Sequence, residues 1–328
     1  MLLSIVIPSY NHAQFVVSTI QAAARINVQD KEVIVIDDGS SDASVSVIRE
    51  YIASRGTDHN IRLITRENRG LVRTLNEGLA MAKGKYFYAV ASDDIPIPEG
   101  ICRLVKHLES SRDLQFVLGN ALLMDSEYQH EFTTAYGEAH RRFFALPFGR
   151  RNKEMFLDYP HPMLLQASVF KTSTLKDIKG WREDIISDDF SLFLRLLSQH
   201  KDEGKDFAFQ PDVMTCFYRR HGANVSLNLE RQFMTIDQAL TQLCPTEWRD
   251  EAYLRNFADL GIMALKKREI SAALRLFQFT FAHMGLLRCL RAAGPAFKDS
   301  LKKRISQRLS HNIVIMHEQA ALKDSPHE

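Results

Sequence analysis

Residues 33–42 read VIVIDDGSSD, four β-branched residues followed by two aspartates and a glycine–serine turn. An apolar run of this kind is typical of a strand buried on both faces of a parallel sheet. Similar short runs lie before and after it, and helix-compatible stretches separate them. We expect strands at 3–7, 33–36, 61–65 and 86–91, and helices at about 13–24, 43–54, 71–82 and 98–110.

The repeated strand–helix–strand pattern predicts an α/β fold with a mostly parallel sheet, right-handed crossovers and helices on both faces. Gly84 is expected to end the third helix, and Pro98 to lie near the start of the fourth. Ligands of such sheets bind beyond the carboxyl ends of the strands. The region from 116 to 218 is less regular, and helical spacing returns at 229–243, 247–266, 269–284 and 297–311. We therefore expect two domains, 1–226 and a helical region at 227–328.

The composition is that of an ordinary globular protein. The chain has 328 residues and a net charge of +2, with 45% hydrophobic and 25% charged residues. These values exclude a disordered, collagen-like or low-complexity chain. No signal peptide or membrane span is recognisable, so a cytoplasmic protein is expected. The four cysteines lack zinc-site spacing and are expected to be free thiols: Cys102, Cys216, Cys244 and Cys289.

Two of the expected strands end in adjacent carboxylates, Asp37-Asp38 and Asp93-Asp94. A single pair of this kind is common in surface turns. Two pairs at the same edge of one parallel sheet repel each other, and a bound cation or ligand would absorb that charge. Carboxylate oxygens are preferred ligands of hard divalent cations.

The chain resembles family 2 inverting glycosyltransferases over residues 2–226. The resemblance rests on short motifs in a specific order: Ser4–Asn11 (SIVIPSYN), Val35–Asp42 (VIDDGSSD), Asn68-Arg69-Gly70 with Asn76 and Gly78, and Ala91–Asp94 (ASDD). It implies a GT-A fold, a nucleotide-diphosphate-sugar donor, a divalent metal ion and inversion at the anomeric carbon.

The resemblance also implies which residues contact the donor nucleotide. Asp38 accepts hydrogen bonds from the base with Asp37 beside it, and Asn68 and Gly70 lie on a loop that closes over the base. The complete expected set is Pro8, Ser9, Tyr10, Asp37, Asp38, Asn68, Gly70 and Asp93.

The metal site, Mn²⁺ or Mg²⁺, is implied at Asp93 and Asp94, and which of the two ligates the ion stays open. Many relatives carry an additional acid where this chain has Ala91, a departure that allows a weaker metal site. His221 matches a histidine near the metal and diphosphate in a Tyr-Arg-x-His-x-x-Asn-x-Ser segment. Arg219 and Arg220 add positive charge there for the leaving phosphates.

Asp189 is the candidate catalytic base. The segment Ser187–Leu197 has the pattern of a helix capped by Ser187. On a helical wheel Asp188 falls on the polar face, whereas Asp189 falls on the apolar arc near Phe193 and Leu196. An inward carboxylate requires a partner or a function. The resemblance places the family's base at the second acid of this pair.

Acceptor residues are expected between 136 and 166, a stretch rich in aromatic and basic side chains. Trp181 is a further candidate, for stacking on a sugar ring or for packing. Asp188 is a candidate at the same site. The sequence leaves open which sugar is donated or accepted.

Basic residues concentrate between Lys266 and Arg308. Eleven Lys or Arg face two acids, Glu269 and Asp299, so this segment carries +9 and the rest of the chain −7. A basic amphipathic tail suits an anionic membrane surface and a lipid-linked acceptor. A helical bundle with a solvated basic face explains the same pattern. Nucleic-acid binding is not expected, because no recognition motif accompanies the charge.

These features together predict a metal-dependent inverting glycosyltransferase. We expect a UDP-, dTDP- or GDP-sugar donor and a glycan or lipid-linked oligosaccharide acceptor in surface polysaccharide or O-antigen synthesis, with the inner face of the cytoplasmic membrane as a candidate location. A nucleotidyltransferase is one alternative, although residues after the first strand lack a glycine-rich phosphate loop. A non-catalytic sugar-nucleotide-binding assembly protein is the other.

Overall fold

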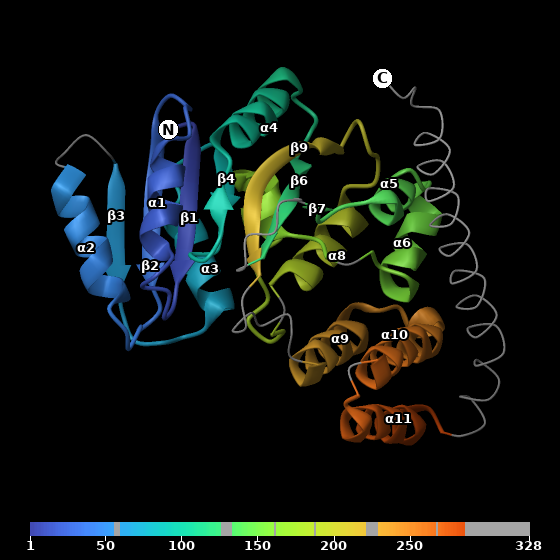
Figure 1. The fold of residues 1–328 in the computed structure, drawn as a ribbon. Coiled ribbons are helices and arrows are strands. Elements are labelled where there is room, and N and C mark those ends of the chain that lie inside the picture. The colour runs from blue at the N-terminus through green and yellow to red at the C-terminus, as the bar shows by residue number, and fades with distance from the viewer. Residues whose placement is uncertain are drawn as a thin grey trace, which may run out of the picture. The chain divides into compact units, whose positions relative to one another are not determined.

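The computed structural model describes residues 1–55, 60–125, 133–160, 162–186, 188–220, 229–266 and 268–285 (Figure 1). The chain divides into two compact units, Met1–Cys244 and Pro245–Glu328. The domain boundary expected near residue 226 lies outside the described residues.

The first unit is built on a sheet whose described strands follow the order β3-β2-β1-β4-β8-β6-β9-β5, with β7 paired to β6 (Figure 1). The four strands expected from the sequence are present and run parallel. The strands are β1 Leu3–Ser9, β2 Lys31–Asp37, β3 Ile61–Thr65, β4 Tyr86–Ala89, β5 Ile95–Pro96, β6 Phe116–Asp125, β7 Thr133–Thr134, β8 Ser168–Lys171 and β9 Phe207–Arg220.

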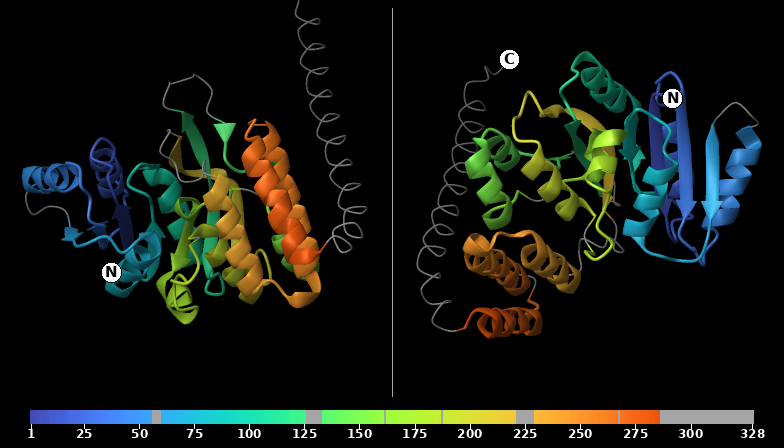
Figure 2. Two further views of the ribbon diagram at one scale, coloured as in Figure 1. Left: turned by 90° about the horizontal axis from the view of Figure 1, so that it is seen from below. Right: turned by 180° about the vertical axis from the view of Figure 1, so that it is seen from behind.

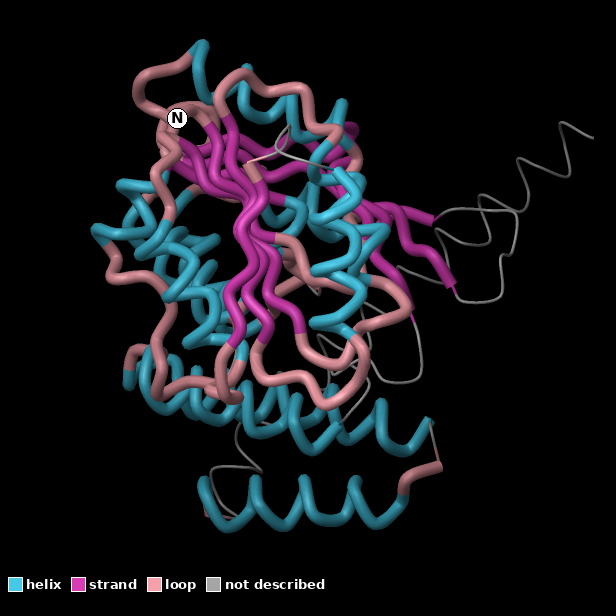
Figure 3. The backbone as a smooth tube through the Cα atoms, turned by 90° about the vertical axis from the view of Figure 1, so that its left-hand side faces the viewer, coloured by secondary structure: helices cyan, strands magenta, loops and turns pink. Residues whose placement is uncertain are grey.

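Helices lie on both sides of this sheet, as Figure 3 shows. The expected helices of the first half are confirmed, and α4 begins at Pro98 as predicted. The helices of the first unit are α1 Val16–Ala24, α2 Ser44–Arg55, α3 Leu71–Met81, α4 Pro98–Ser110, α5 Glu138–Phe144, α6 Phe148–Leu157, η1 Leu165–Ala167, α7 Thr172–Asp177, α8 Asp189–Gln199 and α9 Leu229–Leu243.

Alternate residues of β1 explain how the sheet is covered, because successive side chains of a strand point to opposite faces. Ile5 joins a buried apolar cluster with Val16 and Ile20 of α1. Val6 points the other way, toward α3. A Cβ atom on Gly78 of α3 would lie 2.4 Å from Val6 Cγ1, so only glycine lets the helix pack this closely.

The irregular middle of the sequence supplies the antiparallel part of the sheet. β8 pairs antiparallel with both β4 and β6, and β5 pairs antiparallel with β9. The long strand β9 runs parallel to β6, with register shifts around Asn120. This arrangement carries the end of β9 and the turn before β8 to the carboxyl edge of the parallel strands.

The prediction that Gly84 ends the third helix is wrong. α3 ends at Met81, and the next residue, Ala82, already has an extended backbone. A Cβ atom on Gly84 would lie 2.4 Å from the backbone nitrogen of Ser4. Close approach to β1 therefore requires glycine here, since any side chain would collide with the neighbouring backbone.

The described part of the second unit is a pair of helices, α10 Thr246–Lys266 and α11 Ile270–Met284 (Figure 2). The rings of Phe257 and Phe279 meet edge to face across the pair, with centroids 5.8 Å apart. These helices and α9 confirm three of the four helical segments expected after residue 226, and 297–311 lies outside the described residues. No helix among the described residues is long and apolar enough to cross a membrane.

The cysteines that the structure describes are free thiols, as expected. Cys216 and Cys244 are buried, and Cys102 is half-buried. Cys289 lies outside the described residues. The thiols therefore belong to the packing of the fold, which fits the behaviour of a free cysteine as a small apolar residue.

Candidate active site

Asp37 shapes the turn after β2. Its Oδ1 accepts a hydrogen bond from the backbone nitrogen of Ser40 at 2.9 Å, and its Oδ2 accepts one from Ser40 Oγ at 2.7 Å. The residue is 1% exposed. An aspartate that bonds the chain a few residues further on stabilises a tight turn. Both carboxylate oxygens of Asp37 therefore serve the turn.

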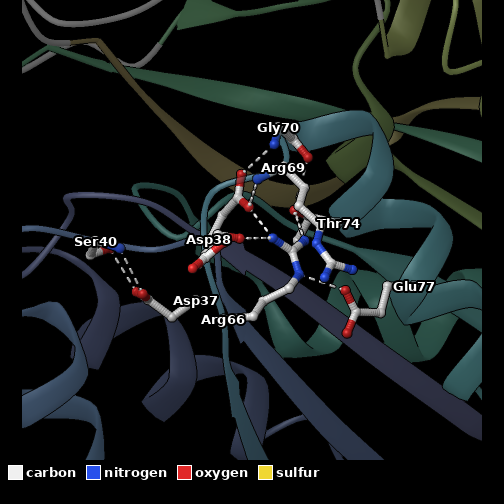
Figure 4. A network of polar contacts seen from close by, with 9 residues as sticks. Asp37, Asp38, Ser40, Arg66, Arg69, Gly70, Thr74 and Glu77 are labelled. Atoms are coloured by element: carbon white, nitrogen blue, oxygen red, sulfur yellow. Dashed lines mark hydrogen bonds and ion pairs between the residues drawn. The ribbon is translucent and has the colours of Figure 1, made fainter.

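Asp38 points the other way, into the loop that follows β3 (Figure 4). Its Oδ1 accepts hydrogen bonds from the backbone nitrogen of Arg69 at 2.7 Å and from Arg66 Nη1. Its Oδ2 accepts one from the backbone nitrogen of Gly70 at 2.9 Å. A carboxylate has about four acceptor sites, so Asp38 retains capacity for a further donor while it holds this loop.

Arg66 connects this loop to α3. Its guanidinium donates to Glu77 Oε2 and to Thr74 Oγ1, both at 2.7 Å, in addition to Asp38 (Figure 4). Burial lowers the pKa of Arg66, but the hydrogen bonds to Glu77 and Asp38 together outweigh this effect, so the net shift of the pKa is upward. The loop 66–70 is therefore fixed between the β2 turn and the start of α3.

Replacement of Arg66 by Met is expected to destabilise the protein, because it leaves the buried Asp38 carboxylate without its cationic partner. Loss of one partner from a buried ion pair typically costs about 3–5 kcal/mol. At about 2–4 °C per kcal/mol for a unit of this size, the melting temperature should fall by roughly 6–20 °C. Arg73→Met is the matched control, since the Arg73–Glu183 pair is exposed and such pairs contribute little. Equal melting temperatures for the two variants would contradict this role of Arg66.

Gly39 allows the β2 turn and the loop 66–70 to touch. Its φ is +74°, and a Cβ atom there would lie 2.6 Å from the backbone nitrogen of Asn68. Asn68 itself is exposed. The glycine of the Asp-Asp-Gly-Ser turn is thus required both by its backbone conformation and by contact with the loop.

The end of β1 lies beside the same turn, because the backbone nitrogen of Asp38 donates to Ser9 O at 2.8 Å. Pro8 and Ser9 are buried, and Tyr10 is 48% exposed. Ser9 Oγ is buried without a hydrogen-bond partner in the described structure. The residues expected at the nucleotide site therefore share one edge of the sheet, with an exposed aromatic ring and a buried hydroxyl among them.

Asp93 and Asp94 follow β4 at this edge but have different surroundings. Asp94 is 1% exposed, and its Oδ2 and Oδ1 accept hydrogen bonds at 2.8 Å from Gln166 Nε2 and from the backbone nitrogen of Arg219. The Asp93 side chain is 13% exposed, and its Oδ2 lies 3.8 Å from His12 Nε2. Burial, followed by repulsion from Asp93, raises the pKa of Asp94 well above its usual range. Asp94 is thus held inside the fold, whereas Asp93 reaches the surface.

Asp189 is the first residue of α8. It is half-buried, and its Oδ1 accepts a hydrogen bond from the backbone nitrogen of Leu165 at 3.2 Å. Burial is the main reason that the pKa of Asp189 is raised well above its usual range, and the charges of Asp188 and Asp94 add to it. Leu165 is followed directly by Gln166, which bonds Asp94, so adjacent residues connect Asp189 to the acidic turn after β4.

Of the other expected site residues, one lies next to Asp189, one lies in the core, and two are outside the described residues. Asp188 is half-buried and immediately precedes α8, and the expected capping residue Ser187 lies outside the described residues. Trp181 is 1% exposed, and its ring lies 5.9 Å from that of Phe87. The indole is therefore part of the core and offers no face to a sugar, so packing is the one of its two expected roles that the structure supports. His221 lies outside the described residues.

A divalent ion at this edge is chemically compatible with the residues present. Among the described residues no group of three or more His, Cys, Asp or Glu side chains is close enough to hold a metal ion. Magnesium and similar ions often bind through one or two carboxylates together with substrate phosphates. The surface-reaching carboxylate of Asp93 fits that mode, since the ligand itself supplies the remaining oxygens.

Three residues of this edge were not singled out from the sequence. His12 contacts the acidic turn, with Nδ1 2.8 Å from Ser92 Oγ, and its place directly after the first strand was an available signal. Arg66 and Gln166 carry no local signal, because their partners are distant in the sequence. Gln166 and Asp94, for example, are 72 residues apart.

Sequence comparison identifies a family model that matches residues 4–174, "Glycosyl transferase family 2". The chain is 31% identical over 120 residues to the glycosyltransferase GlyG of Streptococcus pneumoniae, covering 36% of this chain and 38% of that protein. It is 24% identical over 196 residues to poly-beta-1,6-N-acetyl-D-glucosamine synthase of Staphylococcus epidermidis, covering 59% of this chain and 45% of that protein. The matched part is thus less than half the length of each relative.

Solved structures share the fold. S. aureus TarS 1–349 in complex with UDP-GlcNAc superposes with a TM-score of 0.54 and 16% identity, covering 79% of this chain and 73% of that one. The mannosyltransferase PcManGT from Pyrobaculum calidifontis, in complex with GDP-Man and Mn²⁺, also gives 0.54 at 16% identity, covering 90% and 87%. The expected architecture, a mixed and mostly parallel sheet flanked by helices, is therefore confirmed as that of GT-A glycosyltransferases.

Proposed function

The chain belongs to glycosyl transferase family 2, and from this premise we propose that it is a metal-dependent inverting glycosyltransferase. It transfers a sugar from a UDP-, dTDP- or GDP-sugar to a hydroxyl group of a glycan or lipid-linked oligosaccharide in surface polysaccharide synthesis, of which O-antigen is one kind. The catalytic domain is proposed to span 1–226, followed by the helical region 227–328.

One observation carries this proposal. Three carboxylates from distant parts of the chain support it: Asp38 follows β2, Asp93 follows β4 at the same edge of the sheet, and Asp189 is linked to Asp94 of that edge through the adjacent residues Leu165 and Gln166. Asp94 interacts electrostatically with Asp189 and bonds Arg219 across 125 residues of sequence. Transfer from a nucleotide-sugar requires groups for the nucleotide, the diphosphate and the acceptor hydroxyl, and this arrangement supplies a carboxylate for each.

The nucleotide is proposed to bind between the β2 turn and the loop 66–70. Asp38 accepts a hydrogen bond from the base with its remaining acceptor capacity, while Tyr10 offers an exposed ring against it. Ser9 Oγ, buried without a partner, would gain one from the ribose. Asn68 and Gly70 close over the base on a loop that Arg66 already holds in position. Bound donors of this kind in related folds support the assignment.

Asp93 is proposed to hold a divalent ion, Mn²⁺ or Mg²⁺, against the donor diphosphate, with His221 as a further contact. Such an ion stabilises the negative charge that develops on the leaving diphosphate. Asp94 is proposed to support this turn from within, because its oxygens already accept hydrogen bonds from Gln166 and Arg219. Arg219 adds positive charge at the same place, with its guanidinium 4.4 Å from the centroid of the Phe15 ring.

Asp189 is proposed to act as the general base. Its carboxylate takes the proton of the acceptor hydroxyl as that oxygen forms a bond to the anomeric carbon. The bond from the anomeric carbon to the diphosphate oxygen breaks at the same time, and its electron pair leaves with the nucleoside diphosphate. Attack opposite to the leaving group inverts the anomeric carbon. Asp188, adjacent to the base, is proposed to face the acceptor.

The discriminating experiment incubates the protein with UDP-, GDP- and dTDP-sugars, Mn²⁺ and a panel of glycan acceptors, and identifies the released nucleotide. Nucleoside diphosphate is the expected product, and the anomeric configuration of the glycan product should be inverted by NMR. Release of pyrophosphate would instead indicate a nucleotidyltransferase. Donor binding without any release would indicate a non-catalytic sugar-nucleotide-binding protein.

The second unit is proposed to bind an anionic membrane surface, which would present a lipid-linked acceptor at the inner face of the cytoplasmic membrane. Three apolar side chains of α11 lie on one helical face and are 63%, 57% and 40% exposed: Ile270, Leu274 and Phe277. Arg268 and Arg275 are exposed beside them. Apolar residues flanked by basic ones on a helix are typical of binding to anionic lipid surfaces.

We expect the protein to float with vesicles that contain an anionic lipid and not with purely zwitterionic vesicles. Leu274→Glu should weaken flotation by roughly tenfold, because it removes an apolar contact and adds a repelled charge. Met234→Glu on α9 is the matched control, since Met234 is also exposed, at 40%. Flotation that is independent of lipid charge would contradict the membrane proposal. An equal effect of both substitutions on flotation would contradict it as well.

A further inference from the structure

A short segment, residues 164–166, joins the two buried parts of the candidate active site. The backbone nitrogen of Leu165 donates to Asp189 Oδ1 at 3.2 Å. The side-chain amide of the next residue, Gln166, donates to Asp94 Oδ2 at 2.8 Å. Two adjacent residues therefore contact the proposed base and the acid behind the proposed metal site. We call residues 164–166 the bridging segment.

The bridging segment is itself held by the core. Tyr136 Oη accepts a hydrogen bond from the backbone nitrogen of Leu164 at 2.6 Å, and Tyr136 is 2% exposed. Thr215 Oγ1 donates to Gln166 O at 3.2 Å and to Asn120 O at 2.9 Å, and Thr215 is fully buried. The two donors that bond Asp94 and Asp189 therefore belong to a segment that hydrogen bonds to buried residues hold in place.

The chemistry of Gln166 suits such a link. Its side chain is buried, with 7% of the residue exposed, and donates to the carboxylate without adding a charge. A lysine would introduce a buried cation, and a glutamate would add a carboxylate beside Asp93 and Asp94. A hydrogen bond to a carboxylate is short and directional. Gln166 therefore sets the position of Asp94, while the adjacent Leu165 N–H sets that of Asp189.

We propose that Gln166 is a positioning residue for sugar transfer, which couples the placement of Asp94 at the donor side to that of Asp189 at the acceptor side. This inference rests on the function proposed above. Gln166 touches neither donor nor acceptor in this scheme and acts through the two carboxylates. Reacting groups must lie within about 3–3.5 Å, and a misplacement of about 1 Å costs on the order of 10²-fold in rate.

The test replaces Gln166 by Met, which keeps the length of the side chain and removes the hydrogen-bond donor. We expect kcat to fall about 10–100-fold, with the donor KM changed less than about threefold, because the loss concerns the reacting geometry. Gln115→Met is the matched control. Gln115 is a half-buried glutamine whose Oε1 accepts a hydrogen bond from a side chain, Thr174 Oγ1 at 2.9 Å, and it lies away from the acids.

The double variant Gln166→Met/Asp189→Asn distinguishes positioning from general stability. Because Gln166 acts through both carboxylates, its replacement should lower the residual rate by a clearly smaller factor once Asp189 is neutral, when only the part of the loss that runs through Asp94 remains. An equal fractional loss in both backgrounds, or a wild-type kcat for Gln166→Met, would overturn the proposal. If Gln166→Met does not fold, Thr215→Val loosens the same segment from its backbone side and should give a smaller, equally base-dependent loss.

The activity of the wild-type protein distinguishes a failure of the Gln166 proposal from a failure of the proposed function. Absence of nucleoside diphosphate release by the wild type would reject the proposed function itself. Release by the wild type, together with unchanged kinetics of Gln166→Met and Thr215→Val, would reject the role of Gln166 alone.

Discussion

An Asp189→Asn variant is expected to lose sugar transfer by about 10²–10⁴-fold, the usual contribution of a positioned general base. Asparagine has nearly the same shape, and its Oδ1 still accepts the hydrogen bond from the backbone nitrogen of Leu165. The substitution therefore removes the proton acceptor and leaves the structural contact. Donor binding, measured by thermal shift with nucleoside diphosphate and Mn²⁺, should be retained.

The melting temperature of Asp189→Asn is a control for folding, and the direction of its change can be predicted. Burial and the charges of Asp188 and Asp94 raise the pKa of Asp189, so the ionised carboxylate is less favourable in the folded than in the unfolded chain. That penalty is fully present above the folded pKa, decreases as the pH falls toward the unfolded value near 3.9, and is absent below the unfolded value. Asp189→Asn should thus melt at the same temperature as the wild type or higher at neutral pH.

Asp184→Asn is the matched substitution at the surface. Asp184 pairs with Arg182 in an exposed ion pair shortly before α8, and loss of such a pair should leave kcat unchanged. Retention of more than about a tenth of the wild-type kcat by Asp189→Asn would contradict its role as the base.

The pH dependence of kcat tests the same residue independently. Asp189 accepts a proton only as the carboxylate, so kcat should fall as the pH drops through its pKa. Because that pKa is raised, the fall should begin above the ordinary aspartate range near 3.9. The residual activity of Asp189→Asn should lack this acidic limb.

Asp93→Asn is expected to have the next largest effect, a loss of about 10²–10³-fold in kcat. A metal ion at a leaving group supplies several kcal/mol of charge stabilisation, and each 1.36 kcal/mol corresponds to about tenfold in rate. The Mn²⁺ concentration for half-maximal activity should also rise. Without ligands the variant should be no less stable, because Asp93 raises the pKa of the buried Asp94 by repulsion.

A thermal-shift comparison separates this metal role from a structural one. Mn²⁺ with nucleoside diphosphate should raise the melting temperature of the wild type and of Asp113→Asn, an exposed aspartate in the loop after α4. The same additions should raise that of Asp93→Asn much less. An unchanged Mn²⁺ titration in Asp93→Asn would show that the ion, if required, binds elsewhere.

The parallel half of the fold was predictable because its signals are local. Four apolar runs, each followed by a helix, specify β1 to β4, and Pro98 marks the start of α4. The mixed half was predicted only at 213–217, which lies within β9, since β6 and β8 depend on pairing between segments far apart in the sequence. Gly84 was misinterpreted for the same reason, because the constraint on it comes from Ser4, 80 residues away.

The candidate site divides in the same way. Its acids stand at strand ends or at the start of a helix, where the chain pattern marks the pairs Asp37-Asp38 and Asp93-Asp94 and the inward Asp189 as candidates. The role of Trp181 was not decided locally: an aromatic ring before α8 suits a sugar or the core equally, and only packing against Phe87 places it in the core.

The sequence by itself determined the family, the parallel sheet and the carboxylates at its edge, because these depend on periodicity and on motifs within short stretches. Only the tertiary structure decided that Asp94 is held within the fold while Asp93 reaches the surface. It also decided that Gln166 and Leu165 join Asp94 to Asp189. Hydrogen bonds between residues that are distant in the sequence do not show in its periodicity. The different roles of chemically identical aspartates can therefore be assigned only when their neighbours in the fold are known.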